Sequence, residues 1–233
     1  MAARWLAGLL LGAGLMGCAP GPVITPAQPA LAPTGTPEAA AENFVAVASR
    51  VMPVAESICR ERTRGVPCDY QIAIDDRPGQ APNAFQTLDE QGQPVLVFTL
   101  ALIRDVQNPD ELAFVMGHET AHHIAGHIQR QREEIMQGAL IAGTLATLGG
   151  ADANAVKEAQ DMGAQIGARR YSKDYELEAD ALGTEIAWRA GFDPMLGAQF
   201  FTRLPDPGNR FLGSHPPNAQ RLAVVAQTLA TLQ

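Results

Sequence analysis

The spacing of apolar residues predicts a helix over residues 38–62, because side chains three and four positions apart share one face of a helix. Pro53 is expected to bend this helix, since proline lacks the backbone N–H that the helix would use there. The residues that form the apolar face are Phe44, Val47, Ala48, Val51, Val54, Ala55 and Ile58.

Alternation of apolar and polar residues, the pattern of a half-buried strand, follows this helix. It predicts strands over residues 70–75, 83–88 and 95–99. Residues 89–92 supply the turn between the last two strands. We expect a small antiparallel sheet directly before the next helix. An edge strand of this sheet can hold an extended peptide by strand addition or can simply cover the core, and the sequence leaves both roles open.

A second helix is predicted to begin at residue 109 and to run to about residue 130. Asn108 is a suitable N-cap and Pro109 suits the first helical position. Glu111, three residues after the cap, completes a capping-box pattern. The apolar residues on one side of this helix, which we expect to face a core, are Leu112, Val115 and Met116.

The same side of this helix carries the pattern H-E-x-x-H. At 100° per residue, His118 and His122 stand one above the other, with Glu119 beside them. Two imidazoles one turn apart can take two corners of a zinc tetrahedron, and the carboxylate can act as general base on a water in the open position. A carboxylate turned toward a core needs a partner or a metal ion. The pattern therefore predicts a zinc site rather than scattered polar residues.

A second pair of histidines, His123 and His127, repeats the spacing of four residues. No glutamate follows His123, which lies about 140° around the helix from His118. We interpret His123 and His127 as residues behind the metal site or on the surface.

Two histidines leave zinc under-coordinated, so a third ligand must come from another segment. Residues 171–183 contain two carboxylates, Glu176 and Asp180, on one helical stripe with small residues that let another helix approach closely. We predict that Glu176 is the third ligand and that Asp180 accepts the free ring N–H of a ligating histidine. The small residues are Gly183 and Ala187.

The opposite side of this segment has the pattern of a solvated surface, with Glu178 and an i, i+4 pair of Glu185 and Arg189. Glu178 is therefore predicted to be the exposed carboxylate. Spacing alone does not exclude the alternative that the whole segment is an acidic surface helix.

Composition limits the classes of function. The chain has 233 residues, enough for one domain and a short appendage. Its formal net charge of −8 argues against nucleic acid as a partner, because binding to phosphates needs a basic face. Apolar residues make up 46% of the chain but aromatic residues only 6%, so we expect a helix-rich core packed through small side chains.

Residues 1–17 have the features of an export signal. Arg4 supplies a positive start, and the apolar run over 5–16 is too short to span a bilayer. Leucine at −3 and glycine at −1 before Cys18 resemble a bacterial lipobox, which implies cleavage before Cys18 and acylation of its sulfur. The alternative is an ordinary secretory signal. Ala19 after the cysteine favours the outer membrane, by resemblance to lipoprotein sorting rules, with acyl chains as the anchor.

Two further segments lack a periodic pattern that defines their structure. Residues 18–37 are rich in Pro, Ala, Gly and Thr, so we expect an extended tether between lipid and a folded domain over 38–233. Residues 138–150 are apolar and glycine-rich but too few to cross a membrane. They are expected either to pack as a helix or to form a mobile flap.

Cys59 and Cys68 are the remaining cysteines. In an exported protein an even pair predicts a disulfide. On the chain-entropy description, closing this small loop stabilises the fold by about 2–3 kcal/mol. Two free thiols are the alternative.

Residues 111–123, followed by the E-x-x-x-D pattern that begins at Glu176, resemble the zinc metalloendopeptidases related to the CAAX prenyl protease. The sequence is most similar to the periplasmic, outer-membrane-associated quality-control members of that family, from about residue 80 to the C-terminus. The resemblance implies a mostly helical α+β domain of the zincin type, one Zn²⁺ per chain, and Glu176 as third ligand. The other matching segments are 83–85, 190–194 and 214–221.

His215 lies in a loop before a helix that Pro216 and Pro217 can start. Taken alone, a loop histidine is usually exposed to solvent. The resemblance instead implies that His215 approaches the zinc, either to stabilise the oxyanion or to occupy the water position in a latent form.

The sequence therefore predicts a zinc endopeptidase, lipid-anchored in the periplasm and held at the outer membrane, that cleaves unfolded or misassembled envelope proteins. One alternative is a latent or inactive peptidase fold that serves as a chaperone or binding lipoprotein. Another is a structural lipoprotein without zinc. The intact Glu119 argues against a purely structural zinc site, which needs no base beside an open coordination position.

Overall fold

The computed structural model describes residues 36–170, 172–204 and 216–233. Four predicted features lie outside these residues: the export signal, the acylation site Cys18, the tether apart from its last two residues, and His215.

The described residues are mostly helical, with one small sheet, which confirms the predicted α+β class. The strands are β1 (Gln71–Asp75), β2 (Ala84–Leu88) and β3 (Pro94–Thr99). The helices are α1 (Pro37–Arg62), α2 (Leu100–Asp105), α3 (Pro109–Ile124), α4 (His127–Leu148), α5 (Ala153–Arg170), α6 (Ser172–Arg189), α7 (Pro194–Gly197), α8 (Phe200–Arg203) and α9 (Asn218–Leu232). None of the helices in this part of the chain has both the length and the apolar character needed to span a membrane.

The start of α3 and its cap agree with the prediction, but Glu111 bonds to the residue before the cap and not to the cap itself. The side chain of Asn108 accepts a hydrogen bond of 2.9 Å from the backbone N–H of Glu111, and Pro109 is the first helical residue. The carboxylate of Glu111 reaches back to the N–H of Gln107, at 2.9 Å. The two polar side chains thus satisfy backbone donors on both sides of the helix start.

The end of α3 differs from the prediction. The helix stops at Ile124 instead of running to about residue 130, because Gly126 takes a positive φ of 67°, which is favourable only for a residue without a Cβ. A new helix, α4, begins at His127. This break turns the chain, so His127 does not continue the surface of α3.

The sheet is mixed. Strand β3 lies in the middle, with β2 antiparallel on one side and β1 parallel on the other. The prediction of a wholly antiparallel sheet was wrong for β1. After β1 the chain crosses to the far edge, forms β2, and returns through a tight turn as β3, so that β1 and β3 run in the same direction. The crossing leaves β2 as an edge strand.

Helix α3 packs against both α1 and α6. The contact with α6 is close because glycines face each other: a Cβ on Gly117 would lie 2.8 Å from the carbonyl oxygen of Gly183. Such an approach brings side chains of α6 within reach of the H-E-x-x-H residues of α3, as the small residues in the stripe predicted.

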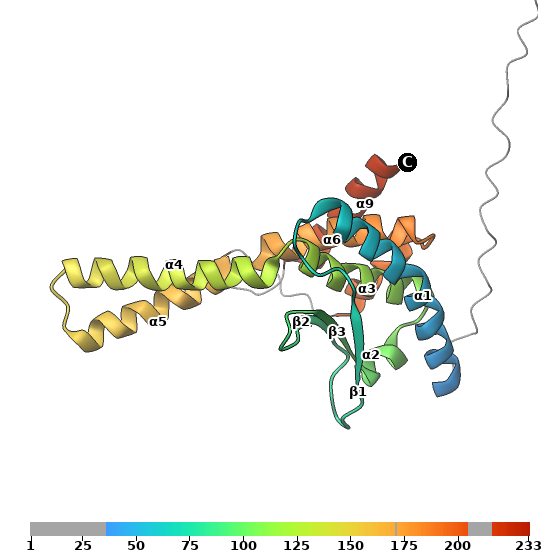
Figure 1. The fold of residues 1–233 in the computed structure, drawn as a ribbon, viewed down its shortest axis with the longest axis horizontal. Coiled ribbons are helices and arrows are strands. Elements are labelled where there is room, and N and C mark those ends of the chain that lie inside the picture. Colours follow the sequence, from blue (N-terminus) through green and yellow to red (C-terminus); the bar gives the residue numbers. More distant parts are fainter. Residues whose placement is uncertain (1–35, 171, 205–215) are drawn as a thin grey trace, which may run out of the picture.

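Residues 138–150 belong mainly to α4, which confirms the first of the two predicted possibilities, a packed helix. Helices α4 and α5 form a long hairpin that projects from the body of the molecule (Figure 1).

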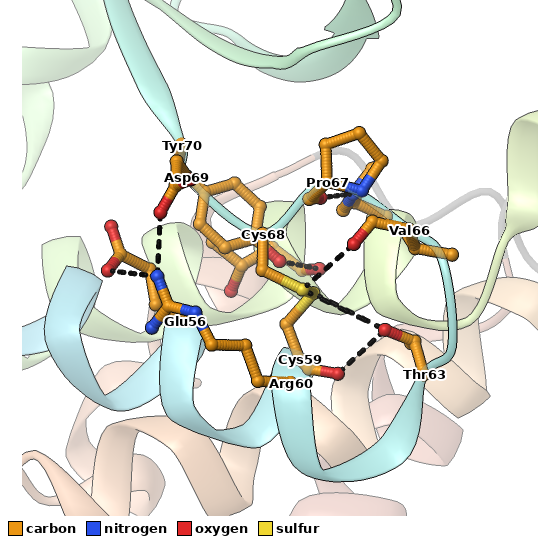
Figure 2. Close-up of a disulfide and its surroundings, with 11 residues drawn as sticks. Glu56, Cys59, Arg60, Thr63, Val66, Pro67, Cys68, Asp69 and Tyr70 are labelled. Atoms are coloured by element: carbon orange, nitrogen blue, oxygen red, sulfur yellow. Dashed lines mark hydrogen bonds and ion pairs between the residues drawn. A yellow bond between two sulfur atoms is a disulfide. The ribbon is translucent and has the colours of Figure 1, made fainter.

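A disulfide joins Cys59, near the end of α1, to Cys68 in the loop before β1 (Figure 2). Beside it, Arg60 is paired with Glu56 of the same helix at 3.2 Å and with Asp69 of the loop at 2.6 Å. The covalent bond and this ion pair both hold the loop against the end of α1.

Candidate metal centre

Three side chains from two helices converge beside the α3–α6 contact. The Nε2 atoms of His118 and His122 lie 3.0 Å apart. The carboxylate of Glu176 lies 3.6 Å from the Nε2 of His118 and 3.4 Å from the Nε2 of His122. One donor atom from each residue falls within 4.8 Å of the others. The structure thus brings together the two histidines one turn apart and the glutamate predicted as third ligand.

The far side of the His118 ring contacts Asp180. The Nδ1 of His118 lies 2.9 Å from the carboxylate of Asp180, whose side chain is fully buried. Burial disfavours the charged imidazole, but the hydrogen bond to Asp180 and the charges of Asp180 and Glu176 outweigh it, so the pKa of His118 is raised. Asp180 therefore contacts the Nδ1 of a candidate ligand, which is the contact that the sequence predicted for it.

Arg221 of α9 holds this aspartate in place. Its guanidinium makes two hydrogen bonds to the carboxylate of Asp180, at 2.7 and 2.6 Å, and stacks at 3.5 Å over the ring of Phe201. Arg221 is itself buried. Sequence reasoning assigned Arg221 no role, although it ends the matching segment 214–221, because α9 is far from α6 along the chain.

The far side of the His122 ring contacts His127. Their Nδ1 atoms lie 2.8 Å apart, and the Nε2 of His127 lies 3.2 Å from the carboxylate of Glu178. The ring of Tyr175 stacks on His127 at a centroid distance of 4.5 Å. Burial, and to a smaller extent the neighbouring His122, lower the pKa of His127 to about 4. His127 thus lies behind the site, one of the two positions predicted for it.

His123 takes neither predicted position. It is buried, its Nε2 donates a hydrogen bond of 2.7 Å to the carbonyl oxygen of Pro67, and its ring packs edge-on against Tyr70. The prediction for His123 was wrong because Pro67, in the loop that the disulfide closes, and Tyr70, just after it, cover this side of α3, which the helical pattern of α3 does not reveal.

The second side of α6 is only partly a solvated surface. Glu178 is half exposed, and Arg130 pairs with it at 2.8 Å. Glu185, however, is buried, which corrects the prediction. Arg62 at the end of α1 and Arg189 one turn along α6 contact its two oxygens at 2.5 and 2.8 Å, and these charges make its burial tolerable.

The candidate metal ligands line a cavity of about 390 Å³. Glu119 lines the same cavity and is half-buried, so its carboxylate is available beside the metal position. Residues 83–86, which include the start of the edge strand β2, form another part of the wall. The base of α4 contributes Ile128 and Gln131.

The donor set fits zinc. Two imidazole nitrogens and one carboxylate oxygen are the ligands of many catalytic zinc sites, which leave a fourth position open. Both rings use their Nδ1 atoms for contacts inside the protein, His118 with Asp180 and His122 with His127. The two Nε2 atoms are therefore the ring nitrogens available to a shared ion, with Glu176 as the candidate third donor.

Comparison with known proteins gives a family match and several relatives. The model of peptidase family M48 matches residues 45–229. The beta-barrel assembly-enhancing protease of Yersinia pestis is 32% identical over 129 residues, 52% of this chain and 26% of that protein. The Escherichia coli K12 protein of the same name is 30% identical over 141 residues, 55% of this chain and 29% of that protein.

A more distant relative is the mitochondrial metalloendopeptidase OMA1 of Saccharomyces cerevisiae, which is 28% identical over 174 residues, 69% of this chain and 47% of that protein. The aligned part of the chain spans about a quarter of the length of the bacterial relatives and about half of the yeast protein.

Proposed function

Because this chain belongs to peptidase family M48, we propose that it is a zinc-dependent endopeptidase in which His118, His122 and Glu176 hold one zinc ion per chain. The observation that carries this proposal is the convergence of the three donor side chains at a cavity that also contains Glu119. Similarity to proteases and metalloendopeptidases supports the reaction class.

In this proposal, Glu119 is the general base. Zinc, when bound, supplies a Lewis acid that polarises the scissile carbonyl and makes water a better nucleophile at neutral pH. The carboxylate of Glu119 accepts a proton from the attacking water and later delivers it to the leaving amine. Asp180 and His127 hold the rings of His118 and His122 so that the Nε2 atoms stay directed at the metal position.

The substrate is proposed to bind as an extended chain along β2. Among the described residues this strand lies at an edge of the sheet, and residues 83–86 line the cavity that contains Glu119. Backbone groups at the edge can pair with the backbone of a peptide, so recognition would depend little on substrate side chains. This favours peptide binding over the alternative that β2 only covers the core.

Unfolded or misassembled envelope proteins are the proposed substrates. Support comes from the similarity to two proteins named for enhancing beta-barrel assembly. We further propose a periplasmic location with an acyl anchor on Cys18 in the outer membrane, and an approach of His215 to the zinc. The roles of Cys18 and His215 rest on sequence resemblance, since both residues lie outside the described part of the chain.

The test compares cleavage of casein by the purified wild type and by Glu119→Gln at equal zinc content. Glu158→Gln, which changes an exposed glutamate of α5, is the matched control. Cleavage by the wild type and by Glu158→Gln, but not by Glu119→Gln, is the expected result. Equal cleavage by all three proteins would contradict the role of Glu119. Zinc binding without cleavage by any of them would favour the chaperone or binding role.

The substrate class needs a separate measurement in cells. Depletion of the protein is expected to slow the turnover of misassembled envelope proteins, and restoration of the wild type, but not of Glu119→Gln, is expected to recover it. If depletion leaves the turnover of misassembled envelope proteins unchanged, the assignment of these proteins as substrates is contradicted. The proposed peptidase activity is not affected by this result.

A further inference from the structure

The hairpin of α4 and α5, which we call the arm, exposes large apolar side chains that the proposed peptidase site does not use. It projects from the body of the molecule (Figure 1). On α4, Leu140, Leu145 and Leu148 are 68%, 65% and 80% exposed. The other exposed large apolar residues of the arm are Met136, Ile141, Met162 and Ile166.

The seam between the two helices of the arm is made of small residues. A Cβ added to Gly138 would overlap the backbone of Gly163, and one added to Gly167 would overlap the backbone of Glu134. The helices therefore touch through their backbones. A seam of small residues also occurs between α3 and α6 in the body of the molecule. Helix pairs in lipid place small residues in the seam and also turn large apolar side chains outward. The arm combines both features.

The part of α4 beyond residue 134 differs from α5 in charge. Residues 135–151 include no charged side chain. Helix α5 carries exposed charges, among them the pair of Lys157 and Asp161, whose side chains are 73% and 64% exposed. An uncharged stretch of α4 beside a charged α5 suits the boundary between hydrocarbon and water.

The length of the apolar part limits how the arm can meet a bilayer. Residues 135–148 of α4 extend about 21 Å at 1.5 Å per residue, less than the roughly 30 Å of bilayer hydrocarbon. The predicted tether between Cys18 and α1 can reach about 60 Å when extended, which is long enough to let the arm contact the membrane that holds the anchor. The arm is therefore suited to enter one leaflet and not to span the bilayer.

We propose that the arm is a membrane-binding element, with Leu140, Ile141, Leu145 and Leu148 of α4 inserted into one leaflet and the charged side of α5 facing water. The partner is a lipid bilayer. The chain carries a net charge of −8, so burial of apolar surface, and not attraction to anionic headgroups, drives the contact. Binding is expected to zwitterionic phosphatidylcholine vesicles as well as to vesicles that contain phosphatidylglycerol.

The test uses the full chain reconstituted with vesicles and a fluorophore that reports an apolar environment. Thr144→Cys places the label on the exposed side of α4 without removing a leucine, and Ser57→Cys places it on the exposed side of α1. Because Cys59 and Cys68 are joined in a disulfide, the introduced thiol is available for labelling. The protein without an introduced cysteine, labelled in parallel, gives the background from Cys18.

The label at residue 144 is expected to shift to shorter wavelength and to be quenched by spin-labelled acyl chains, while the label at residue 57 is not. Adding Leu140→Gln and Leu145→Gln keeps good helix formers in α4 but should lower partition into lipid at least about tenfold. The matched control, Val45→Gln, changes a similarly exposed apolar residue of α1 and should leave the quenching unchanged.

Three results would overturn the proposal. Lipid quenching at residue 144 that does not exceed the background from the protein without an introduced cysteine would show that the arm does not enter the bilayer. A spectral shift that grows with protein concentration, without lipid quenching, would assign the arm to a second copy of the chain. A shift that occurs only after addition of unfolded casein would assign it to polypeptide binding. No cleavage is measured, so each of these results leaves the proposed peptidase activity intact.

Discussion

The Nδ1 atoms of His122 and His127 lie 2.8 Å apart, so one of the two rings must supply the proton between them. The other nitrogen of His127 lies 3.2 Å from the Glu178 carboxylate, which can only accept when ionised. A neutral His127 therefore carries its proton on Nε2 and accepts from His122 through Nδ1. This arrangement leaves the Nε2 of His122 with a free lone pair directed at the metal position.

Replacement of His127 by Ala is expected to weaken zinc binding about 10- to 100-fold, because His122 loses the acceptor that orients its ring. Competition with a chromophoric chelator measures the dissociation constant. His127→Gln, which retains an acceptor oxygen, should recover part of the affinity. Equal affinities of the wild type and His127→Ala would show that His122 needs no such partner.

Arg221→Met is expected to destabilise the fold by about 3–5 kcal/mol, since it leaves the buried carboxylate of Asp180 without its cation. Urea unfolding of the metal-free protein measures the free energy. The double variant Arg221→Met/Asp180→Leu should regain much of the stability but should bind zinc more weakly than the wild type, because His118 then lacks its acceptor Asp180. A single variant as stable as the wild type would refute the argument.

Gly183→Ala tests the close approach of α6 to α3. The new Cβ would lie 2.8 Å from the backbone nitrogen of His118 and would push the two helices apart. A destabilisation of about 1–3 kcal/mol is expected, together with weaker zinc binding, because Glu176 is carried on α6. Thermal unfolding with and without zinc separates the two effects. Unchanged zinc affinity would mean that Glu176 can follow the metal when its helix moves.

The buried His123 predicts a pH dependence of stability. Burial lowers the pKa of its imidazole, and the hydrogen bond to Pro67 offsets this only in part. The folded-state pKa is thus below the value of about 6.5 in the unfolded chain, so the unfolded chain binds the proton first as the pH falls. This contribution to stability is complete above about pH 6.5 and is lost as the pH falls toward the folded-state pKa.

The measurement is urea unfolding of metal-free protein at pH 7, 6 and 5, since zinc release would add its own pH dependence. Relative to His123→Gln, the wild type should lose up to about 1.4 kcal/mol per pH unit in this range. If the free energy of unfolding falls equally with pH in the wild type and in His123→Gln, the pH dependence does not come from His123.

Much of the candidate site was predictable because its residues are local in the sequence. The period of a helix alone places His118 and His122 one above the other, and the cap at Asn108 sets where that helix begins. The same period separates Glu176 and Asp180 from the charged side of their helix. Strand positions and the disulfide also follow from short-range patterns, namely alternation and an even pair of cysteines.

The tertiary structure decided every feature that depends on segments far apart in the chain. The pairing of Arg221 with Asp180 joins α9 to α6, and the burial of Glu185 requires Arg62 from α1. The parallel pairing of β1 with β3 depends on how the chain crosses the sheet. Periodicity records only which side of an element is apolar. Which element packs against that apolar side depends on the arrangement of the whole chain. A short sequence pattern carries no information on this.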